Sequence, residues 1–309
     1  MTWDDGSPHL RELAPGVLGY LQPTGGWMVN NCGVVTDAAG DVLLIDTTST
    51  EKRTRALLAA TAGVATRPPR FAVNTHHHPD HTYGNGCLPA TTVVVGHRLA
   101  RDGVLRAGLA ATAEIAADYG ELTVRAPELT FTDGLTLHLA DFAVDLITMG
   151  PAHTPGDVAV WLPSQRVLFA GDLVTSGSHP MFLEGSMHGF RTALTRLRAL
   201  DPVALLPGHG PACVGDDVAR VLDELIAYVD WTAELATSSR ADGLTPLEAA
   251  RRVAGDDPYR DWSEGERVVG NLTRAYVELT DYRPDVPLTV PGLMAAMVEL
   301  NGGPIASHA

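Results

Sequence analysis

The stretch His76-His77-His78-Pro79-Asp80-His81, or HHHPDH, holds four of the twelve histidines of this 309-residue chain. It follows an apolar run at residues 70–75, which we expect to be a β-strand. Alternate side chains of an extended chain point the same way, so His76 and His78 can face one metal ion. The sequence therefore predicts a metal site at the end of this strand.

The second half of the motif points to a second ligand position beside the first. Pro79 forces a turn, which can direct Asp80 and His81 toward a neighbouring point. Imidazole and carboxylate groups suit Zn²⁺ or Fe²⁺, whereas Mg²⁺ would take oxygen ligands. A polar, histidine-rich loop without a metal is the alternative interpretation of this stretch.

Three further candidate ligands follow apolar runs and stand beside glycine or proline. They are His153 in GPAHTPGD, Asp172 in FAGD and His209 in LLPGHG. Each one alone would more often be a surface or hydrogen-bonded residue. Their occurrence at successive strand ends, after HHHPDH, favours one shared metal centre.

Composition and charge exclude several classes of function. The net charge is −15 and no run of Lys or Arg occurs, so we expect neither nucleic acid nor an anionic membrane surface as a partner. Three scattered cysteines form no C-x-x-C pair, which suits a reducing compartment. The amino terminus MTWDDGSPHL has no apolar h-region and no run of about 18 apolar residues follows. We therefore expect a cytoplasmic protein.

The order of apolar runs predicts an α/β core followed by helices. A hairpin is expected at 32–36 and 42–46, and a helix at 50–62 with Ser49 or Thr50 as cap. After residue 215 the apolar residues recur every three or four positions, which is typical of helices. We expect an α/β domain at 1–215 and a helical extension at 216–309. The remaining expected strands are 91–95, 135–139, 142–147, 158–162, 167–170 and 203–206, and the remaining helices are 98–117, 189–200, 267–280 and 291–300.

Taken together, HHHPDH, His153, AGD and PGHG resemble the metallo-β-lactamase superfamily, over residues 76–210. The resemblance implies an αββα sandwich with metals where the strand-end loops meet, here with a C-terminal helical extension. It also implies two metal ions bridged by Asp172. The ligands of one would be His76, His78 and His153, and those of the other Asp80, His81 and His209.

The resemblance implies catalysis by two Zn²⁺ ions, with Fe or Mn as alternatives. Two metals about 3.5–4 Å apart can share a water and lower its pKa, which provides a metal-bridging hydroxide as nucleophile. Asp80 is a candidate base, although its role as a ligand would reduce its basicity. We expect His77, between the ligands, to point away and form a structural hydrogen bond.

A narrower resemblance concerns the segments LQPTGGWMVNNCGVV, NTHHHPDHTYGN, LFAGDLVTSGSHPMFLEGS, GLTPLEAARR and ERVVGNLTRAYVEL. As a set they are similar to the metallo-β-lactamase-type cyclase/thioesterases of aromatic type II polyketide pathways, which serve antibiotic biosynthesis. This similarity implies a polyketide substrate bound to an acyl carrier protein. The implied reaction is aldol cyclisation with loss of water, with thioester hydrolysis as a further step.

Apolar side chains on glycine-flanked loops are candidate contacts for such a substrate: Trp27, Met181, Phe182 and Phe190, with His188 in the same stretch. The alternative is that these side chains pack against the helical extension or an oligomer partner. Exposed apolar loops are also consistent with a homodimer.

Two rival functions use the same scaffold. A general thioesterase or lactonase acting on a small soluble substrate would need the same seven ligands, so the size and apolarity of the pocket must discriminate. An inert binding protein would have lost ligands, and every ligand position is occupied. The acidic chain would attract an acidic carrier protein poorly. Arg98, Arg101 and Arg106 are a candidate local patch for it, or simply a solvated helix face.

Overall fold

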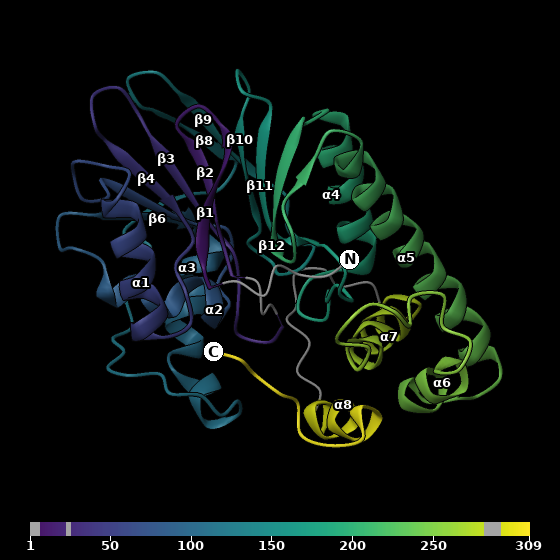
Figure 1. The fold of residues 1–309 in the computed structure, drawn as a ribbon. Coiled ribbons are helices and arrows are strands. Elements are labelled where there is room, and N and C mark those ends of the chain that lie inside the picture. The colour runs from purple at the N-terminus through teal and green to yellow at the C-terminus, as the bar shows by residue number, and fades with distance from the viewer. Residues whose placement is uncertain (1–6, 23–25, 281–291) are drawn as a thin grey trace.

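Two β-sheets lie face to face between outer helices in the computed structural model, which describes residues 7–22, 26–280 and 292–309 (Figure 1). The inner faces pack through side chains such as Val35 and Val73 of one sheet and Val160 and Phe169 of the other. The first sheet also carries Leu57 of a helix on its outer face. This arrangement confirms the predicted αββα sandwich.

The described residues form a seven-stranded and a six-stranded sheet. The first has the order β1 (His9–Ala14), β2 (Val17–Leu21), β3 (Cys32–Thr36), β4 (Val42–Ile45), β5 (Phe71–Asn74), β6 (Val93–His97) and β7 (Leu129–Phe131). The second has the order β13 (Cys213–Val214), β12 (Ala204–His209), β11 (Val167–Thr175), β10 (Val158–Leu162), β9 (Ala143–Thr148) and β8 (Gly134–His138). The predicted hairpin of β3 and β4 is confirmed, whereas β1, β2, β7 and β13 were not predicted.

Strand direction explains why the candidate ligands meet. Strands β4, β5, β6 and β7 pair in parallel, so their carboxyl ends lie on one edge of the first sheet. Strands β11 and β12 also pair in parallel. Strand β9 runs the same way as β11, because both are antiparallel to β10. The loops after these strands therefore face one another across the same edge of the sandwich.

The helices mostly match the predicted ones, with one clear exception. Thr50 caps α1 (Glu51–Ala62) by accepting a hydrogen bond from the amide of Arg53, as expected. The helix expected at 98–117 is shorter in the structure, where α3 spans Arg98–Ala107. Gly108 ends it with a φ of 54°, a conformation that favours glycine. The others are α2 (Pro79–Thr82), α4 (Met187–Ala199), α5 (Asp216–Ala241), α6 (Pro246–Val253), α7 (Arg267–Glu278), α8 (Leu293–Asn301) and the 3₁₀ helices η1 (Tyr83–Cys87) and η2 (Ala110–Ala113).

The C-terminal part is helical, as predicted, and it continues the core of the second sheet. The apolar stripe of α5, which includes Val218, Leu222 and Leu225, is buried in the same cluster as Leu168 of β11. Figure 1 shows α4 and α5 on the outer side of the second sheet, with α6, α7 and α8 at its end. A domain boundary at residue 215 stays a prediction. Residue 291, where the last helix was expected to start, lies outside the described residues.

Candidate metal centre

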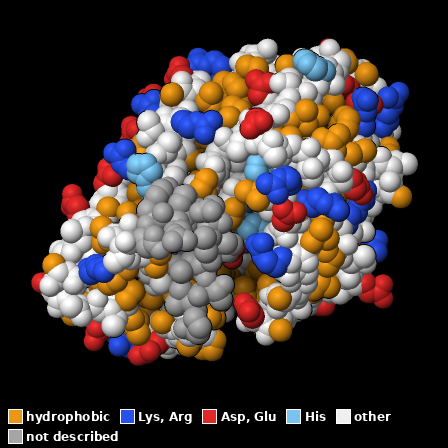
Figure 2. All heavy atoms as spheres, turned by 180° about the vertical axis from the view of Figure 1, so that it is seen from behind, with side chains coloured by type: hydrophobic (Ala, Val, Ile, Leu, Met, Phe, Trp, Pro, Cys, Tyr) orange, Lys and Arg blue, Asp and Glu red, His pale blue; other side chains and the backbone are white. Residues whose placement is uncertain are grey.

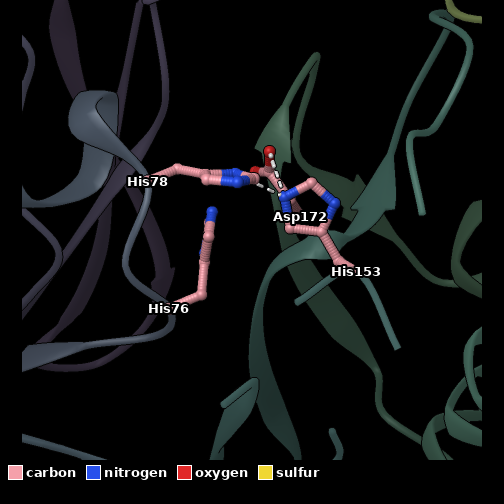
Figure 3. A group of neighbouring side chains, drawn as sticks. All are labelled: His76, His78, His153 and Asp172. Atoms are coloured by element: carbon pink, nitrogen blue, oxygen red, sulfur yellow. Dashed lines mark hydrogen bonds and ion pairs between the residues drawn. The ribbon is translucent and has the colours of Figure 1, made fainter. Parts of the chain in front are cut away.

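Four of the predicted ligands form a first group: His76, His78, His153 and Asp172 (Figure 3). Their ligand atoms all lie within 4.8 Å of one another. Nε2 of His153 is 2.8 Å from Nδ1 of His78 and 3.5 Å from Oδ2 of Asp172. The first two histidines come from the loop after β5, His153 from the loop after β9, and Asp172 from β11.

The other three predicted ligands, Asp80, His81 and His209, form a second group with the same 4.8 Å limit. Oδ2 of Asp80 lies 3.3 Å from Nε2 of His209 and 3.6 Å from Nε2 of His81. Proline at the first position of α2 starts the short helix that carries Asp80 and His81. All three side chains are buried.

Asp172 connects the two groups through its two oxygens. Oδ1 is 3.1 Å from Nε2 of His81, and Oδ2 is 3.2 Å from Nε2 of His209. Oδ2 also faces His153 of the first group. Asp172 is therefore positioned to bridge two ions, as the family resemblance implies.

The donor set fits metal ions, because several buried polar atoms point into it without a hydrogen bond. Nε2 of His76, Nε2 of His81 and Oδ1 of Asp172 form no hydrogen bond within the described part of the chain, although the last two atoms lie 3.1 Å apart. Leaving such buried atoms unsatisfied is costly, and a cation between them removes this cost. Ligand atoms at about 2.0–2.1 Å in a tetrahedral shell lie roughly 3.3 Å apart, close to the separations here. Metal binding by the seven residues stays a prediction that this geometry supports.

Backbone carbonyls and a carboxylate hold the far nitrogens of three ligands. Nδ1 of His209 donates to the carbonyl oxygen of Val29 at 2.9 Å, and Nδ1 of His153 donates to that of Met181. Nδ1 of His81 donates to Asp46. These bonds fix the tautomers that leave Nε2 free for a metal. The sequence analysis missed Asp46, although it follows a buried strand as the predicted ligands do.

Glu184 is a second residue that the sequence analysis missed. Its Oε2 lies 3.1 Å from Nε2 of His77, which has the structural hydrogen bond expected of it. Its Oε1 lies 3.6 Å from Nε2 of His78. Glu184 comes from the loop between β11 and α4, and nothing in its local sequence marks it.

Burial and neighbouring charges separate the protonation states of the ligands. Burial lowers the pKa of His153 to about 3 and also lowers that of His76. Burial acts to raise the pKa of Asp80, but His81 and His209 outweigh it and lower that pKa to about 2. A carboxylate with so low a pKa is a good ligand and a poor base. This weakens the prediction that Asp80 accepts a proton during catalysis.

Five of the seven proposed ligands, His78, Asp80, His153, Asp172 and His209, line a cavity of about 470 Å³, and we call this part of the lining its floor. Of the predicted substrate contacts, Trp27 and Met181 line it. Phe182 and Phe190 do not, because they are fully buried in the core beneath α4, with ring centroids 5.5 Å apart. His188 is exposed on α4 and is not part of the lining. The further lining residues are Met28, His78, Pro79, Asp80, Ala111, Glu114, Ile115, His153, Asp172, Leu183, Glu184, His209, Arg267, Gly292, Leu293, Met294 and Met297.

The family follows from a comparison with protein families. Residues 25–209, more than half of the chain, match the metallo-β-lactamase superfamily. The chain belongs to the metallo-β-lactamase superfamily. All seven predicted ligands, from His76 to His209, lie within the matched residues.

Related proteins are named for different activities. The chain is 25% identical over 275 residues to a linear primary-alkylsulfatase of Pseudomonas sp., covering 72% of this chain and 51% of that protein. It is 28% identical over 183 residues to a hydroxyacylglutathione hydrolase of Brucella anthropi, covering 59% and 60%. The chain thus spans only about half to three fifths of these relatives.

A solved structure supports the fold. A metallo-β-lactamase family protein of Thermus thermophilus superposes with a TM-score of 0.65 and 22% identity. The match covers 87% of this chain and 94% of the other.

Among the described residues, no helix is both long and apolar enough to cross a membrane.

Proposed function

We propose that this protein is a metal-dependent hydrolase that cleaves a carboxylic thioester or a lactone. The observation that carries the proposal is the position of Asp172, which joins two ligand groups at the floor of a cavity. The named relatives add support, because an alkylsulfatase, a hydroxyacylglutathione hydrolase and a metallo-β-lactamase type 2 of Bacteroides fragilis all hydrolyse their substrates. This is the alternative that the sequence analysis left open.

The reaction needs a water and a leaving group. The water oxygen loses a proton and forms a bond to the carbonyl carbon, and the bond from that carbon to the thioester sulfur or the lactone ring oxygen breaks. The departing thiolate or alkoxide takes up the proton that the water gave up. Bound divalent ions, Zn²⁺ by our prediction, would supply Lewis acidity and lower the pKa of water at the floor.

The chain contributes the placement of these components. His76, His78 and His153 would hold one ion and Asp80, His81 and His209 the other, with Asp172 between them. The apolar side chains that line the same cavity would reduce the contact of the reacting groups with bulk water, which strengthens electrostatic interactions with the developing negative charge.

Cyclisation of a carrier-bound polyketide stays a second candidate, because the cavity walls are apolar enough for an aromatic ligand. One relative is named a hydroxyacylglutathione hydrolase, and others are named an alkylsulfatase and a metallo-β-lactamase, so we place hydrolysis first. The proposed arginine patch gives a carrier protein little support. Arg98 forms an ion pair with Asp102 at 3.2 Å, and Arg101 donates to the carbonyl of Pro127.

The expectation of no nucleic-acid partner stays a prediction. On the face drawn in Figure 2, Lys and Arg side chains are interspersed with acidic and apolar ones, and the described part of that face shows no continuous basic strip. The homodimer and the cytoplasmic location stay predictions.

The test compares metal-free, zinc-loaded and Asp172→Asn protein on small thioesters and lactones. We expect about two zinc ions per chain, hydrolysis that chelation removes, and a loss of about 10³-fold or more in D172N. Chelator-resistant hydrolysis, or full activity in D172N, would refute the proposal. The same proteins receive a thioester-linked poly-β-ketone mimic. A product lighter by one water, with a new ring, would instead establish the cyclase.

A further inference from the structure

We infer that the substrate of this site carries an uncharged hydrocarbon acyl chain, which lies along one wall of the cavity. The inference rests on the proposed hydrolase function and adds the chemical class of its substrate. It follows from the composition of the cavity wall and from the state of the charges on it.

The cavity wall above the two ligand groups is apolar and rich in methionine. Met181 lies in the loop after β11, and Met294 and Met297 come from α8, which approaches from the C-terminal part. Trp27 adds a large ring from the loop before β3. Methionine is flexible and polarisable, so such a wall can adapt to a bent or flexible chain. The cavity volume of about 470 Å³ is within the range of small-molecule sites.

Arg267 is the one Lys or Arg among the described residues of the lining, and it already has partners within the protein. Arg267 forms a buried ion pair with Glu264 at 2.8 Å, where the two side chains are 6% and 7% exposed. Its guanidinium also lies 4.8 Å from the centre of the Trp27 ring and donates to the carbonyl of His179. An anionic group that took the place of Glu264 would leave that carboxylate buried without its ion-pair partner, which is costly.

The other charged residues of the lining, apart from the proposed ligands, are acidic. Glu184 is bonded to His77, and Glu114 is exposed next to the 3₁₀ helix η2. A carboxylate at the far end of the acyl chain would therefore face negative charge and lose its hydration. The apolar wall, the ion-paired Arg267 and the acidic residues of the lining together favour an acyl chain without charge.

The first experiment uses the zinc-loaded protein and thioesters of a single small thiol. The neutral series is acetyl, butyryl, hexanoyl and octanoyl, and each longer member has a counterpart of equal length ending in a carboxylate. Burying a methylene should raise kcat/KM about fourfold, until the wall is filled. We expect the carboxylate-ended chains to be worse than their neutral counterparts by about tenfold or more.

Two pairs of variants connect the selectivity to this wall. Met294→Glu should lower the ratio of octanoyl to acetyl turnover sharply, whereas the control Met294→Leu should retain it. Glu114→Lys should narrow the gap between neutral and carboxylate-ended chains, and Glu114→Gln should narrow it less. Met294 is half-buried and Glu114 exposed, so both positions tolerate these changes better than the core.

The outcomes separate the inference from the function on which it rests. If acetyl is cleaved as well as octanoyl, or carboxylate-ended chains are preferred, the inference is overturned and the hydrolase stands. If a chain-length slope persists unchanged in M294E, the chain lies elsewhere and the inference also fails. If none of the thioesters is cleaved in a metal-dependent manner, the proposed function fails as well.

Discussion

Oδ2 of Asp46 lies 2.8 Å from Nδ1 of His81, and both side chains are buried directly behind the second ligand group. Asp46 follows β4 with a φ of 62°, a left-handed conformation that Asp adopts more readily than most residues. It also accepts hydrogen bonds from the amide and hydroxyl of Thr75. Asp46 thus joins the end of β4 to the end of β5 and orients a predicted metal ligand.

Asp46→Asn should weaken metal binding about 10–100-fold, the usual effect of removing a carboxylate behind a histidine ligand. Competition with a coloured chelator measures the affinity. The matched control is Asp37→Asn, a buried aspartate that bonds to the amides of Asp41 and Ala140 away from the ligand groups. Equal metal affinities in D46N and wild type would contradict the orienting role.

Gly208→Ala should disrupt the centre without replacing any of the proposed ligands. A Cβ at this position would lie 2.0 Å from Oδ1 of Asp172, closer than atoms can approach. Asp172 or the backbone must move, so we expect metal content to fall from about two ions toward one or none, measured by elemental analysis. Gly255→Ala is the control, because its Cβ would meet nothing within 4 Å. Full metal content in G208A would show that Asp172 does not need its present position.

Glu184 should act as a positioning residue for His78. Glu184→Ala removes the contacts to His77 and His78, so we expect metal affinity to fall about tenfold. Glu184→Gln should restore part of this loss, because an amide oxygen still accepts the hydrogen bond from His77. The absorption spectrum of the cobalt-substituted protein should change more in the alanine variant. A variant with lower thermal stability but unchanged affinity and spectrum would indicate a purely structural role.

His179 should make stability depend on pH in acid. Burial, followed by the charge of Arg267, lowers its pKa from 6.5 to about 4. Below pH 6.5, His179 therefore binds a proton in the unfolded chain but stays neutral in the folded chain. Its contribution to the free energy of unfolding is complete above pH 6.5 and is lost as the pH falls toward 4. Between these values the wild type should lose about 3 kcal/mol more than His179→Asn.

Urea unfolding across this pH range checks the effect of His179. His138→Asn, which changes an exposed histidine of β8, serves as control and should follow the wild type. A difference between H179N and wild type that stays constant with pH would contradict this account.

Local patterns were sufficient to predict much of the fold and to pick out the candidate metal ligands. HHHPDH and His153 follow β5 and β9, and His209 ends β12, so parallel strands bring them to one edge. Asp172 was expected just after a strand but lies within β11, next to an irregularity in its pairing at Gly171. The buried face of α5 could also be predicted, because apolar residues that recur every three or four positions lie on one side of a helix. Short or exposed elements such as β7 were missed, since they have weak periodicity.

The sequence by itself determined the superfamily, the αββα sandwich and the seven candidate ligands, because each depends on spacing within a short stretch of chain. Only the tertiary structure decided which side chains surround them. Asp46 meets His81 across 35 positions and Glu184 meets His77 across 107. The tertiary structure also buries Phe182 in the core and places residues of α8 in the wall of the cavity. Such contacts depend on how distant segments pack, and a local pattern carries no information about that packing.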